Sequence, residues 1–511
     1  MKRLALALAC AASLASRPDA RAQQAPPAPR CEVTDDATVE RLRRDVAHLA
    51  SDELGGREPG TAGGNAAADY LVRRLTELGV EPAGTEGYRQ PFALEFGVEA
   101  LPASSVLLRA HNETRALAHG VDFRVANAAP ATGDGRAAGG LVYVGHGLES
   151  REAHWSDFGR TSVLRGRIAV GLAGPPAPAD AALAAALRAA HVVGSLAGKA
   201  RAARERGAVG LIEIQLDARE PVETYTAPPT AGGIPVVRIT RAQGEWLLGR
   251  PIAAETAPVT PVRVVGASAR VVTATRRRHI VASNVLGIVR ARATGDAGAV
   301  AASPIVVGAH YDHIGRGGWG SLSPGVYGIY NGADDNASGT SAVLELARRL
   351  VSAPASRDVV VAWFGAEEEG MVGSRWMVSH RPPALTSVTA MVNLDMVGRL
   401  RECRLFVEER ATARALPAIV DAANGPYGFD ARPWEPTRGA WGASDHMTFT
   451  DARIPAVFLF TGLHDDYHRT HDDAPTLNYR GLGAVVGYAE RVLRLVADAA
   501  LRDAPSMTFA R

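Results

Sequence analysis

Four apolar stretches of this sequence each lead into side chains of the types that bind metal ions. These side chains are His310, Asp312, Glu367, Glu368, Asp395 and His468. Burial of carboxylates costs free energy unless a cation or a hydrogen-bond network compensates the charge. A shared metal site would compensate all of them together, and imidazole combined with carboxylate favours zinc or a similar ion over magnesium or calcium.

A further acidic turn, GADDNASG, places Asp334 and Asp335 just before a predicted helix. With this turn included, the carboxylates are too many for one tetrahedral ion. Two ions about 3.5 to 4 Å apart, bridged by one carboxylate and one water, would use them. The residue types therefore predict a site for two metal ions.

Each motif taken alone has a simpler interpretation. A lone histidine is more often structural, GADDNASG alone is typical of a turn that caps a helix, and the run Glu367–Glu369 alone is typical of a solvated surface. Asp395 alone is typical of a buried salt bridge. These interpretations would have to hold together at four strand ends, so the shared site is favoured.

The elements that must position these residues alternate along the second half of the chain. The expected strands are SNVLGIVR, PIVVGAH, VVVAWFG, AMVNLDM and PAVFLF, and the expected helices are Ala66–Leu78, Ser338–Val351, Met371–Ser379, Thr412–Ala423 and Leu482–Ala500. Apolar strands between amphipathic helices predict a sheet covered on both faces. In such sheets the ligand site lies beyond the carboxyl ends of the strands.

The N-terminus predicts export. Lys2 and Arg3 precede an apolar run, so we expect a signal peptide over residues 1–22 and an extended linker over 23–32. The apolar segment before Cys10 is too short to favour a lipid anchor. The mature protein is expected to be secreted or periplasmic, and no later stretch has the length of a membrane span.

The remaining chain predicts one main domain and one inserted module. Short β-like runs around an alanine-rich segment set residues 101–268 apart from a main domain formed by 33–100 and 269–505. Two cysteines, Cys31 and Cys403, remain after export, and the sequence leaves open whether they pair.

The composition excludes several classes of protein. The 511 residues are 47% hydrophobic and 22% charged, which excludes long disorder, collagen and a membrane bundle. Removal of the signal peptide would lower the formal net charge from +2 to about −1. Such a balance implies neither a nucleic acid nor an anionic membrane as partner.

The motifs GAHYD, GADDNASG, FGAEEEG, NLDMVG and YHRTHDD, in this order, resemble those of the co-catalytic di-zinc aminopeptidases typified by bacterial leucyl aminopeptidase. That family includes glutamate carboxypeptidase and glutaminyl cyclase branches. The resemblance covers Val33–Phe96 and Arg270 to about Ala500. It implies a zinc-exopeptidase three-layer αβα sandwich with a central, mostly parallel mixed sheet, and an inserted small α/β protease-associated domain.

The resemblance also implies two zinc ions per chain and their ligands. The ligands it assigns are His310, Asp335, Glu368, Asp395 and His468. In this assignment Asp335 bridges the two ions, and its peptide bond to Asn336 is cis. His471 and His464 remain alternatives to His468.

Three further residues receive roles from the same resemblance. Glu367 matches the general base, Asp312 matches the aspartate that orients His310, and Tyr467 matches a phenol that donates to the oxyanion. Adjacent side chains in an extended segment point to opposite sides, so Glu367 and Glu368 can face water and metal respectively.

We therefore predict an exported metallo-exopeptidase that acts on the N-terminal end of peptide substrates. The acidic surroundings favour a cationic amine, whereas the arginines Arg316, Arg399 and Arg438 are scattered. The alternatives are a carboxypeptidase of the glutamate carboxypeptidase type, a glutaminyl cyclase, and a receptor-like binding protein. A serine hydrolase built on Ser444, Asp445 and His446 is disfavoured because contiguous residues do not form a spatial triad easily.

Overall fold

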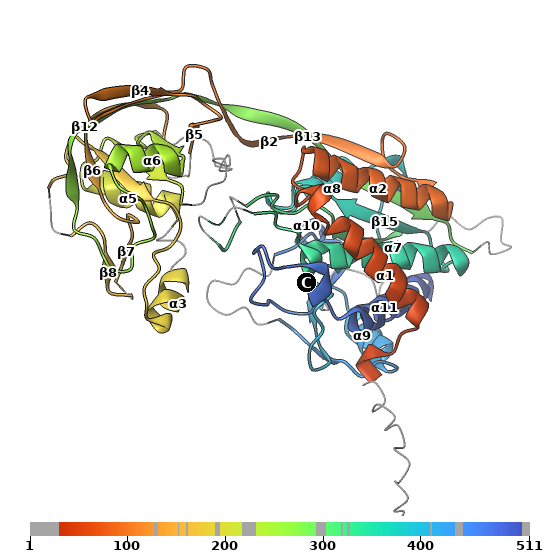
Figure 1. The fold of residues 1–511 in the computed structure, drawn as a ribbon. Helices are drawn as coiled ribbons and strands as arrows, with labels where there is room; N and C mark the ends of the chain where they lie inside the picture. The colour runs from red at the N-terminus through yellow and green to blue at the C-terminus, as the bar shows by residue number, and fades with distance from the viewer. Residues whose placement is uncertain are drawn as a thin grey trace, which may run out of the picture.

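The computed structural model describes two lobes joined by long strands (Figure 1). The described residues are 30–126, 131–151, 153–159, 162–189, 195–216, 231–292, 303–317, 320–323, 326, 328–408, 411–434 and 443–502. The predicted signal peptide, most of the predicted linker and Arg438 lie outside these residues. Among the described residues, no helix combines the length and the apolar character that crossing a membrane requires.

A mixed nine-stranded sheet forms the centre of the larger lobe. In spatial order its strands are β1 (Glu81–Pro82), β13 (Thr275–Val289), β15 (Val359–Phe364), β14 (Ile305–His310), β16 (Ala390–Leu394), β19 (Ala456–Phe460), β17 (Arg404–Glu408) and β18 (Asp430–Arg432), with β2 (Arg89–Ala100) paired to β13. The four strands from β15 to β19 run parallel. Their carboxyl ends therefore meet at one edge of the sheet, where the predicted site residues follow them.

Helices cover both faces of this sheet. One face packs against α1 (Asp36–Leu49), α2 (Ala62–Leu78), α7 (Gly339–Ser352), α9 (Leu416–Asn424) and α11 (Tyr479–Arg502), and the other against α8 (Val372–Ser379) and α10 (His446–Asp451). This arrangement confirms the predicted mixed α/β fold with a central mixed sheet.

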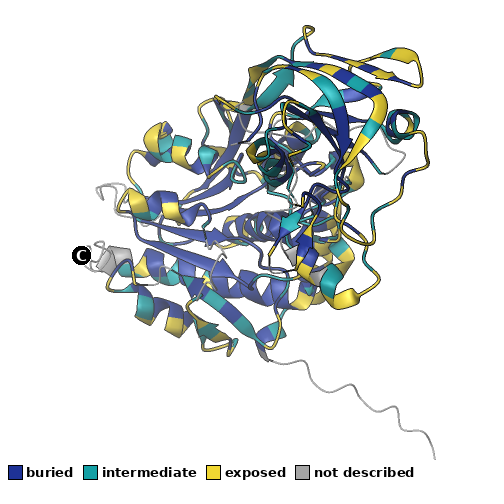
Figure 2. Ribbon diagram, turned by 90° about the vertical axis from the view of Figure 1, so that its left-hand side faces the viewer, coloured by how far each residue is buried: buried dark blue, intermediate teal, exposed yellow. Residues whose placement is uncertain are grey.

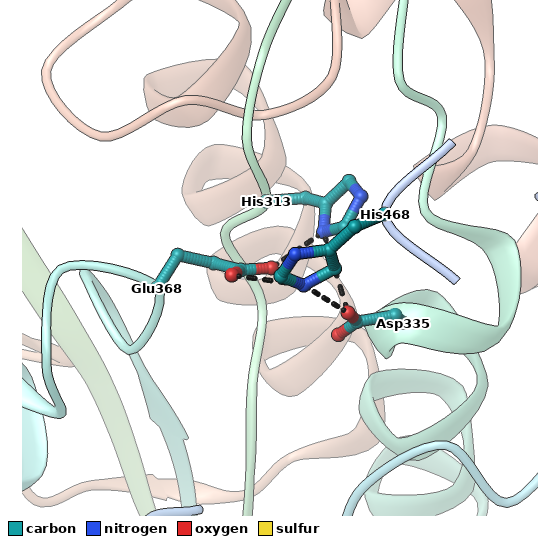
Figure 3. Close-up of side chains that lie close together, drawn as sticks. All are labelled: His313, Asp335, Glu368 and His468. Atoms are coloured by element: carbon teal, nitrogen blue, oxygen red, sulfur yellow. Dashed lines mark hydrogen bonds and ion pairs between the residues drawn. The ribbon is translucent and has the colours of Figure 1, made fainter. Parts of the chain in front are cut away.

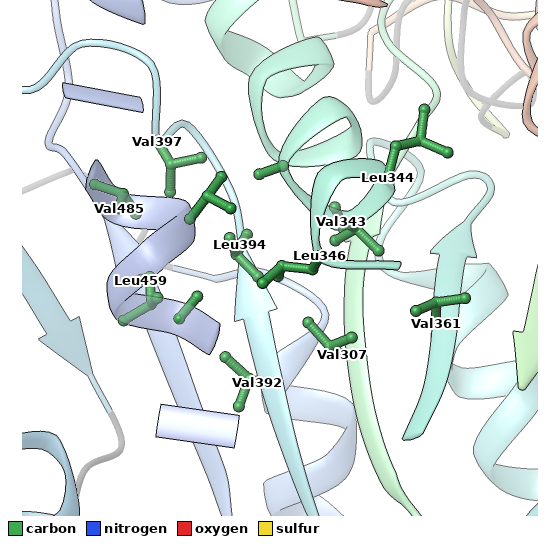
Figure 4. Packing of buried hydrophobic residues seen from close by; sticks show 14 of the residues in the cluster. Val307, Val343, Leu344, Leu346, Val361, Val392, Leu394, Val397, Leu459 and Val485 are labelled. Carbon is green, nitrogen blue, oxygen red and sulfur yellow. The ribbon is translucent and has the colours of Figure 1, made fainter. Parts of the chain in front are cut away.

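Alternating side chains of the parallel strands build the two cores. Val307 and Val361 pack with Leu346 of α7 in one cluster (Figure 4), whereas Val306 and Val360 belong to the cluster on the opposite face. Successive side chains of a strand point to opposite faces, so an apolar run fills both cores. Burial is accordingly densest in the strands and the inner helix surfaces (Figure 2).

An eight-stranded sheet forms the second lobe. Its strands are β4 (Glu113–Leu117), β3 (Ser105–Ala110), β12 (Val262–Thr273), β6 (Gly135–Tyr143), β9 (Ile168–Leu172), β10 (Gly210–Ile214), β11 (Val236–Ile239) and β5 (Phe123–Val125), accompanied by α3 (Ala181–Ala189), α5 (Leu196–Glu205), α6 (Arg241–Leu248) and the small pair β7 (Glu149–Ser150) and β8 (Trp155–Ser156). The antiparallel pair β2 and β13 runs from the first sheet toward this lobe (Figure 1). The sheet reaches Thr273, beyond the predicted limit at residue 268, and its domain identity stays a prediction.

A disulfide bond and short helical turns complete the larger lobe. Cys31 and Cys403 form the disulfide, a pairing that the sequence left open. The short turns are Arg30–Glu32, Asp52–Leu54, Pro383–Leu385 and Ala474–Thr476, together with the π-helical turn Ala333–Ser338.

Three predicted helix starts are wrong by three or four residues: α2 begins at Ala62 and not at Ala66, α11 begins at Tyr479 and not at Leu482, and α9 begins late. We expected a helix from Thr412, but α9 begins at Leu416. Pro417 follows in the first turn, where its fixed φ and missing N–H are tolerated. The proline therefore marks the beginning of this helix.

Candidate active site

The carboxyl ends of the parallel strands bring the predicted residues together. His310 is the last residue of β14, and Asp395 directly follows β16. Glu367 and Glu368 follow β15 after a short turn, and His468 comes from the loop after β19. These side chains start from four strands but converge at one edge of the sheet, as the sequence predicted.

Asp335 lies in the turn Ala333–Ser338, directly before α7, where Asp335 and Asn336 have non-helical backbone angles. Its peptide bond to Asn336 is cis, as the resemblance implied. The backbone N–H of Asp335 donates to Asp472 Oδ2 at 3.0 Å, and Asn336 Nδ2 donates to the carbonyl of Leu394 at 3.0 Å. These bonds fix the Asp335 carboxylate against the carboxyl end of β16.

One group of metal-type donors comprises His310, Asp335 and Asp395. His310 Nε2 lies 3.3 Å from Asp335 Oδ1 and 3.3 Å from Asp395 Oδ1. Bonds from zinc to nitrogen or oxygen are about 2.0 to 2.2 Å, so donors around one tetrahedral ion lie roughly 3.3 Å apart. The three atoms therefore have the spacing of ligands to one ion.

A second group comprises His313, Asp335, Glu368 and His468 (Figure 3). His468 Nε2 lies 3.0 Å from Asp335 Oδ2 and 3.2 Å from Glu368 Oε2. His313 Nδ1 lies 2.7 Å from Glu368 Oε1. Asp335 thus presents one carboxylate oxygen to each donor group.

His313 is not among the site residues predicted from the sequence. This residue directly follows Asp312 in the segment HYDH, and the only signal was a second histidine three positions after His310. An extended chain would turn neighbouring side chains to opposite sides. However, β14 ends at His310, and the chain beyond it returns His313 to the site.

His310 Nδ1 lies 3.3 Å from the backbone carbonyl of Asp312, but the hydrogen bonds of the Asp312 carboxylate go to a neighbouring loop. Asp312 Oδ1 is 3.8 Å from His310 Nδ1. The same oxygen accepts from the backbone N–H of Glu367 at 3.2 Å, and Oδ2 accepts from that of Glu368 at 3.4 Å. Asp312 therefore positions the loop that carries both glutamates, as well as lying against the imidazole.

A cavity open to solvent on one side adjoins the two donor groups, and its lining includes Asp335, Glu368, Asp395 and His468. Glu367 and Tyr467 line it, and the ring of Tyr467 stacks on that of His468 at 3.9 Å between centroids. The apolar wall of the cavity is formed by Met396, Phe458, Phe460 and Leu463. A reacting polar group and an apolar side chain can therefore be held next to each other here.

The site shifts the pKa values of its carboxyl groups in opposite directions. Burial raises the pKa of Glu367 well above its ordinary value, and the nearby Asp445 raises it further against the opposing charge of His310. Burial also disfavours ionisation of Asp335, yet the imidazoles around it, His313 first, hold its pKa well below the ordinary value. Glu367 thus binds a proton more readily than Asp335 does, as a general base must. Burial also raises the pKa values of Asp312, Asp395 and Asp445, so the raised pKa is shared by several carboxyl groups of the site.

The chemistry of the donor set fits divalent cations of the zinc type. Five carboxylates converge in a largely buried region, namely Asp312, Asp335, Glu367, Glu368 and Asp395. His468 Nε2 lies close to two carboxylate oxygens, yet it makes no hydrogen bond of good geometry to any described residue. Imidazole nitrogen and carboxylate oxygen together are ligands that zinc accepts.

Other candidates from the sequence lie outside both donor groups. His464 Nε2 is 3.3 Å from Asp334 Oδ2, and neither residue joins a group. His471 is exposed. Arg399 pairs with Asp472 at 3.1 Å. The structure therefore places His468, of the three histidines considered, among the donors.

The sheet, its helical layers and the donors at its carboxyl edge agree with the comparisons with known proteins, which support a hydrolase of the metallo-exopeptidase class. Residues 284–492 match peptidase family M28. The probable lipoprotein aminopeptidase LpqL of Mycobacterium tuberculosis is 27% identical over 445 residues, which cover 85% of this chain and 75% of that protein. Aminopeptidase YwaD of Bacillus subtilis is 32% identical over 172 residues, which cover 31% of this chain and 32% of YwaD.

A solved structure shows the same fold. BSAP, a zinc aminopeptidase from Bacillus subtilis, matches with a TM-score of 0.56 and 21% identity, over 92% of this chain and 98% of that one. The predicted resemblance to zinc aminopeptidases, the predicted fold class and the predicted enzyme class are thereby confirmed.

Proposed function

We propose that this protein is an exported aminopeptidase that removes N-terminal residues from peptides with two zinc ions per chain. The observation that carries the proposal is the position of Asp335, whose two oxygens each face a separate donor group beside a cavity. One carboxylate that bridges two ions has this arrangement. The Mycobacterium tuberculosis and Bacillus subtilis relatives, both named as aminopeptidases, support the choice of reaction.

In this proposal His310 and Asp395 would hold one ion, Glu368 and His468 would hold the other, and Asp335 would contribute to both sites. When bound, the ions supply Lewis-acid polarisation of the scissile carbonyl and a water that is acidic near neutral pH. The protein contributes the fixed positions of these side chains, which the bonds of Asn336 and Asp472 enforce.

Glu367 takes the proton of the attacking water and delivers it to the leaving amine. It lines the cavity next to the donor groups, and burial gives it a raised pKa in the protein alone. Such a proton shuttle typically contributes about 10² to 10⁴-fold to the rate. Tyr467 lines the same cavity, and its O–H donates to the carbonyl oxygen as negative charge develops there.

The cavity favours the amine end of an apolar substrate. A terminal carboxylate is usually held by arginine, and no arginine is among the described residues that line the cavity. Arg399 is engaged by Asp466 at 2.9 Å and by Asp472 at 3.1 Å. The carboxylates suit a cationic amine, and the wall of Met396, Phe458 and Phe460 suits an apolar first side chain.

Export and the identity of the second lobe are further parts of the proposal. The features of residues 1–22 support cleavage and a secreted or periplasmic location, which N-terminal sequencing of the mature protein would test. The second lobe combines an eight-stranded sheet with a few helices, and this composition supports the assignment of the lobe as an inserted protease-associated domain.

Hydrolysis of leucine p-nitroanilide by the purified full-length protein tests the proposed reaction. We expect hydrolysis that is abolished by phenanthroline and by N-acetylation of the substrate. Undiminished cleavage of an N-acetylated dipeptide would favour a carboxypeptidase, and cyclisation of N-terminal glutamine without hydrolysis would favour a cyclase. Absence of hydrolysis from a zinc-loaded protein would favour a binding protein.

A further inference from the structure

We propose that His313 is a fourth protein ligand of the ion held by Asp335, Glu368 and His468. The inference rests on the proposed function only in requiring that zinc is bound. Neither the motifs of the sequence nor the family match assigns a role to this histidine. Its side chain is fully buried and faces the other three donors (Figure 3).

The distances within this group are those of four ligands around one ion. The distances from His313 Nδ1 are 2.7 Å to Glu368 Oε1 and 3.8 Å to Asp335 Oδ2. His468 Nε2 lies 3.0 Å and 3.2 Å from oxygens of the same two carboxylates. These values scatter about the roughly 3.3 Å expected between ligands of a tetrahedral ion.

The arrangement of the two histidines supports the same interpretation. Their rings stand nearly perpendicular, with centroids 5.6 Å apart, and each approaches a different oxygen of Glu368. His313 Nε2 has no hydrogen-bond partner among the described residues. The contacts that Nδ1 makes with the donor group therefore account for the polar interactions of this buried ring.

A fourth ligand makes the two metal positions unequal. Closed sites with four protein ligands are typical of structural zinc, whereas catalytic zinc keeps a position open for water or substrate. The group of His310, Asp335 and Asp395 supplies three donors and keeps such a position. We therefore expect the position with His313 to bind zinc more tightly and to fill first.

The alternative is that His313 only hydrogen-bonds Glu368 at 2.7 Å and orients it. Removal of such an orienting partner usually lowers metal affinity about 10 to 100-fold. Loss of a direct ligand is expected to exceed that range. His464 offers a matched control, because it is also a buried histidine that faces an aspartate but lies outside both groups.

Zinc affinity measured by chelator competition, with X-ray absorption spectroscopy, tests the proposal. We expect His313→Ala to lower the zinc affinity of the tighter position more than 100-fold. The control His464→Gln should change this affinity only a few-fold. Wild-type protein loaded with one zinc should show two imidazole ligands.

A loss of 100-fold or less in folded His313→Ala, or one imidazole in the singly loaded wild type, would overturn the proposal. The spectroscopic measurement needs no variant and so holds even if His313→Ala fails to fold. Failure of the wild type to bind zinc at all would instead contradict the proposed function.

Discussion

Replacement of Arg57 by methionine should weaken the fold and the metal site together. The guanidinium is 1% exposed and donates to four backbone carbonyls, those of Leu49, Tyr311, Asn331 and Gly332, at 2.5 to 2.9 Å. Tyr311 lies in the segment that carries His310 and His313, whereas Asn331 and Gly332 lead into the turn that carries Asp335. Arg57 therefore joins the two segments that supply donors to both groups.

The size of the effect follows from these bonds. Hydrogen bonds to a charged group contribute about 1.5 to 3 kcal/mol each, and breaking a buried charged network costs about 3 to 5 kcal/mol in practice. We expect Arg57→Met to lower the free energy of unfolding by about 4 kcal/mol, which for a large domain corresponds to roughly 8 °C in Tm. Because Arg57 orients ligand-bearing segments without contacting metal, zinc affinity should fall about 10 to 100-fold.

Thermal unfolding of the metal-free protein and zinc competition against a chelator measure the two effects. Arg357→Met is the control, because Arg357 is buried in the same lobe but donates to Ser303 and Thr389 near the amino ends of β14 and β16. Arg357→Met should lower Tm without changing zinc affinity. Unchanged zinc affinity in folded Arg57→Met, or an equal loss in the control, would refute the reasoning.

Three further predictions follow from the same structure. Glu367→Ala should retain both zinc ions and lose about 10² to 10⁴-fold in kcat, whereas Glu368→Ala should lose zinc; near-normal turnover of Glu367→Ala would contradict the assignment of the base. His468→Ala should reduce bound zinc toward one per chain, and His471→Ala should leave bound zinc unchanged. The reverse result would assign the ligand role to His471. Although burial alone would raise the pKa of Glu213, its two ion pairs lower it to about 2. The contribution of Glu213 to the free energy of unfolding should thus be complete above about pH 4.5 and disappear as pH falls toward 2. Chemical denaturation at several pH values measures this contribution. If Glu213→Gln had the same pH profile as the wild type, Glu213 would make no such contribution.

Local patterns were sufficient to predict the sheet and most of the donors. Val306 and Val307 fill opposite cores, so the strand that they share appears in the sequence as an uninterrupted apolar run. The donors follow such runs directly, and parallel strands bring their carboxyl ends to one edge. His310 and Asp395 could therefore be grouped without a structure.

Contacts that depend on how the chain turns or on distant segments could not be predicted. The position of His313 depends on the bend after β14, and no periodicity encodes that bend. Arg57 belongs to a segment more than 250 residues away from the carbonyls of Tyr311 and Asn331 that it binds. The apolar wall also mixes Phe458 and Phe460 of one strand with residues of separate loops.

The number of zinc ions bound per chain tests the central claim most directly. Mass spectrometry of the metal content of full-length protein, after dialysis against micromolar zinc, should give two for the wild type. In Asp335→Asn the value should fall below one, because Asp335 faces both donor groups. One zinc or none in the wild type, or two retained in Asp335→Asn, would contradict the bridged pair of ions.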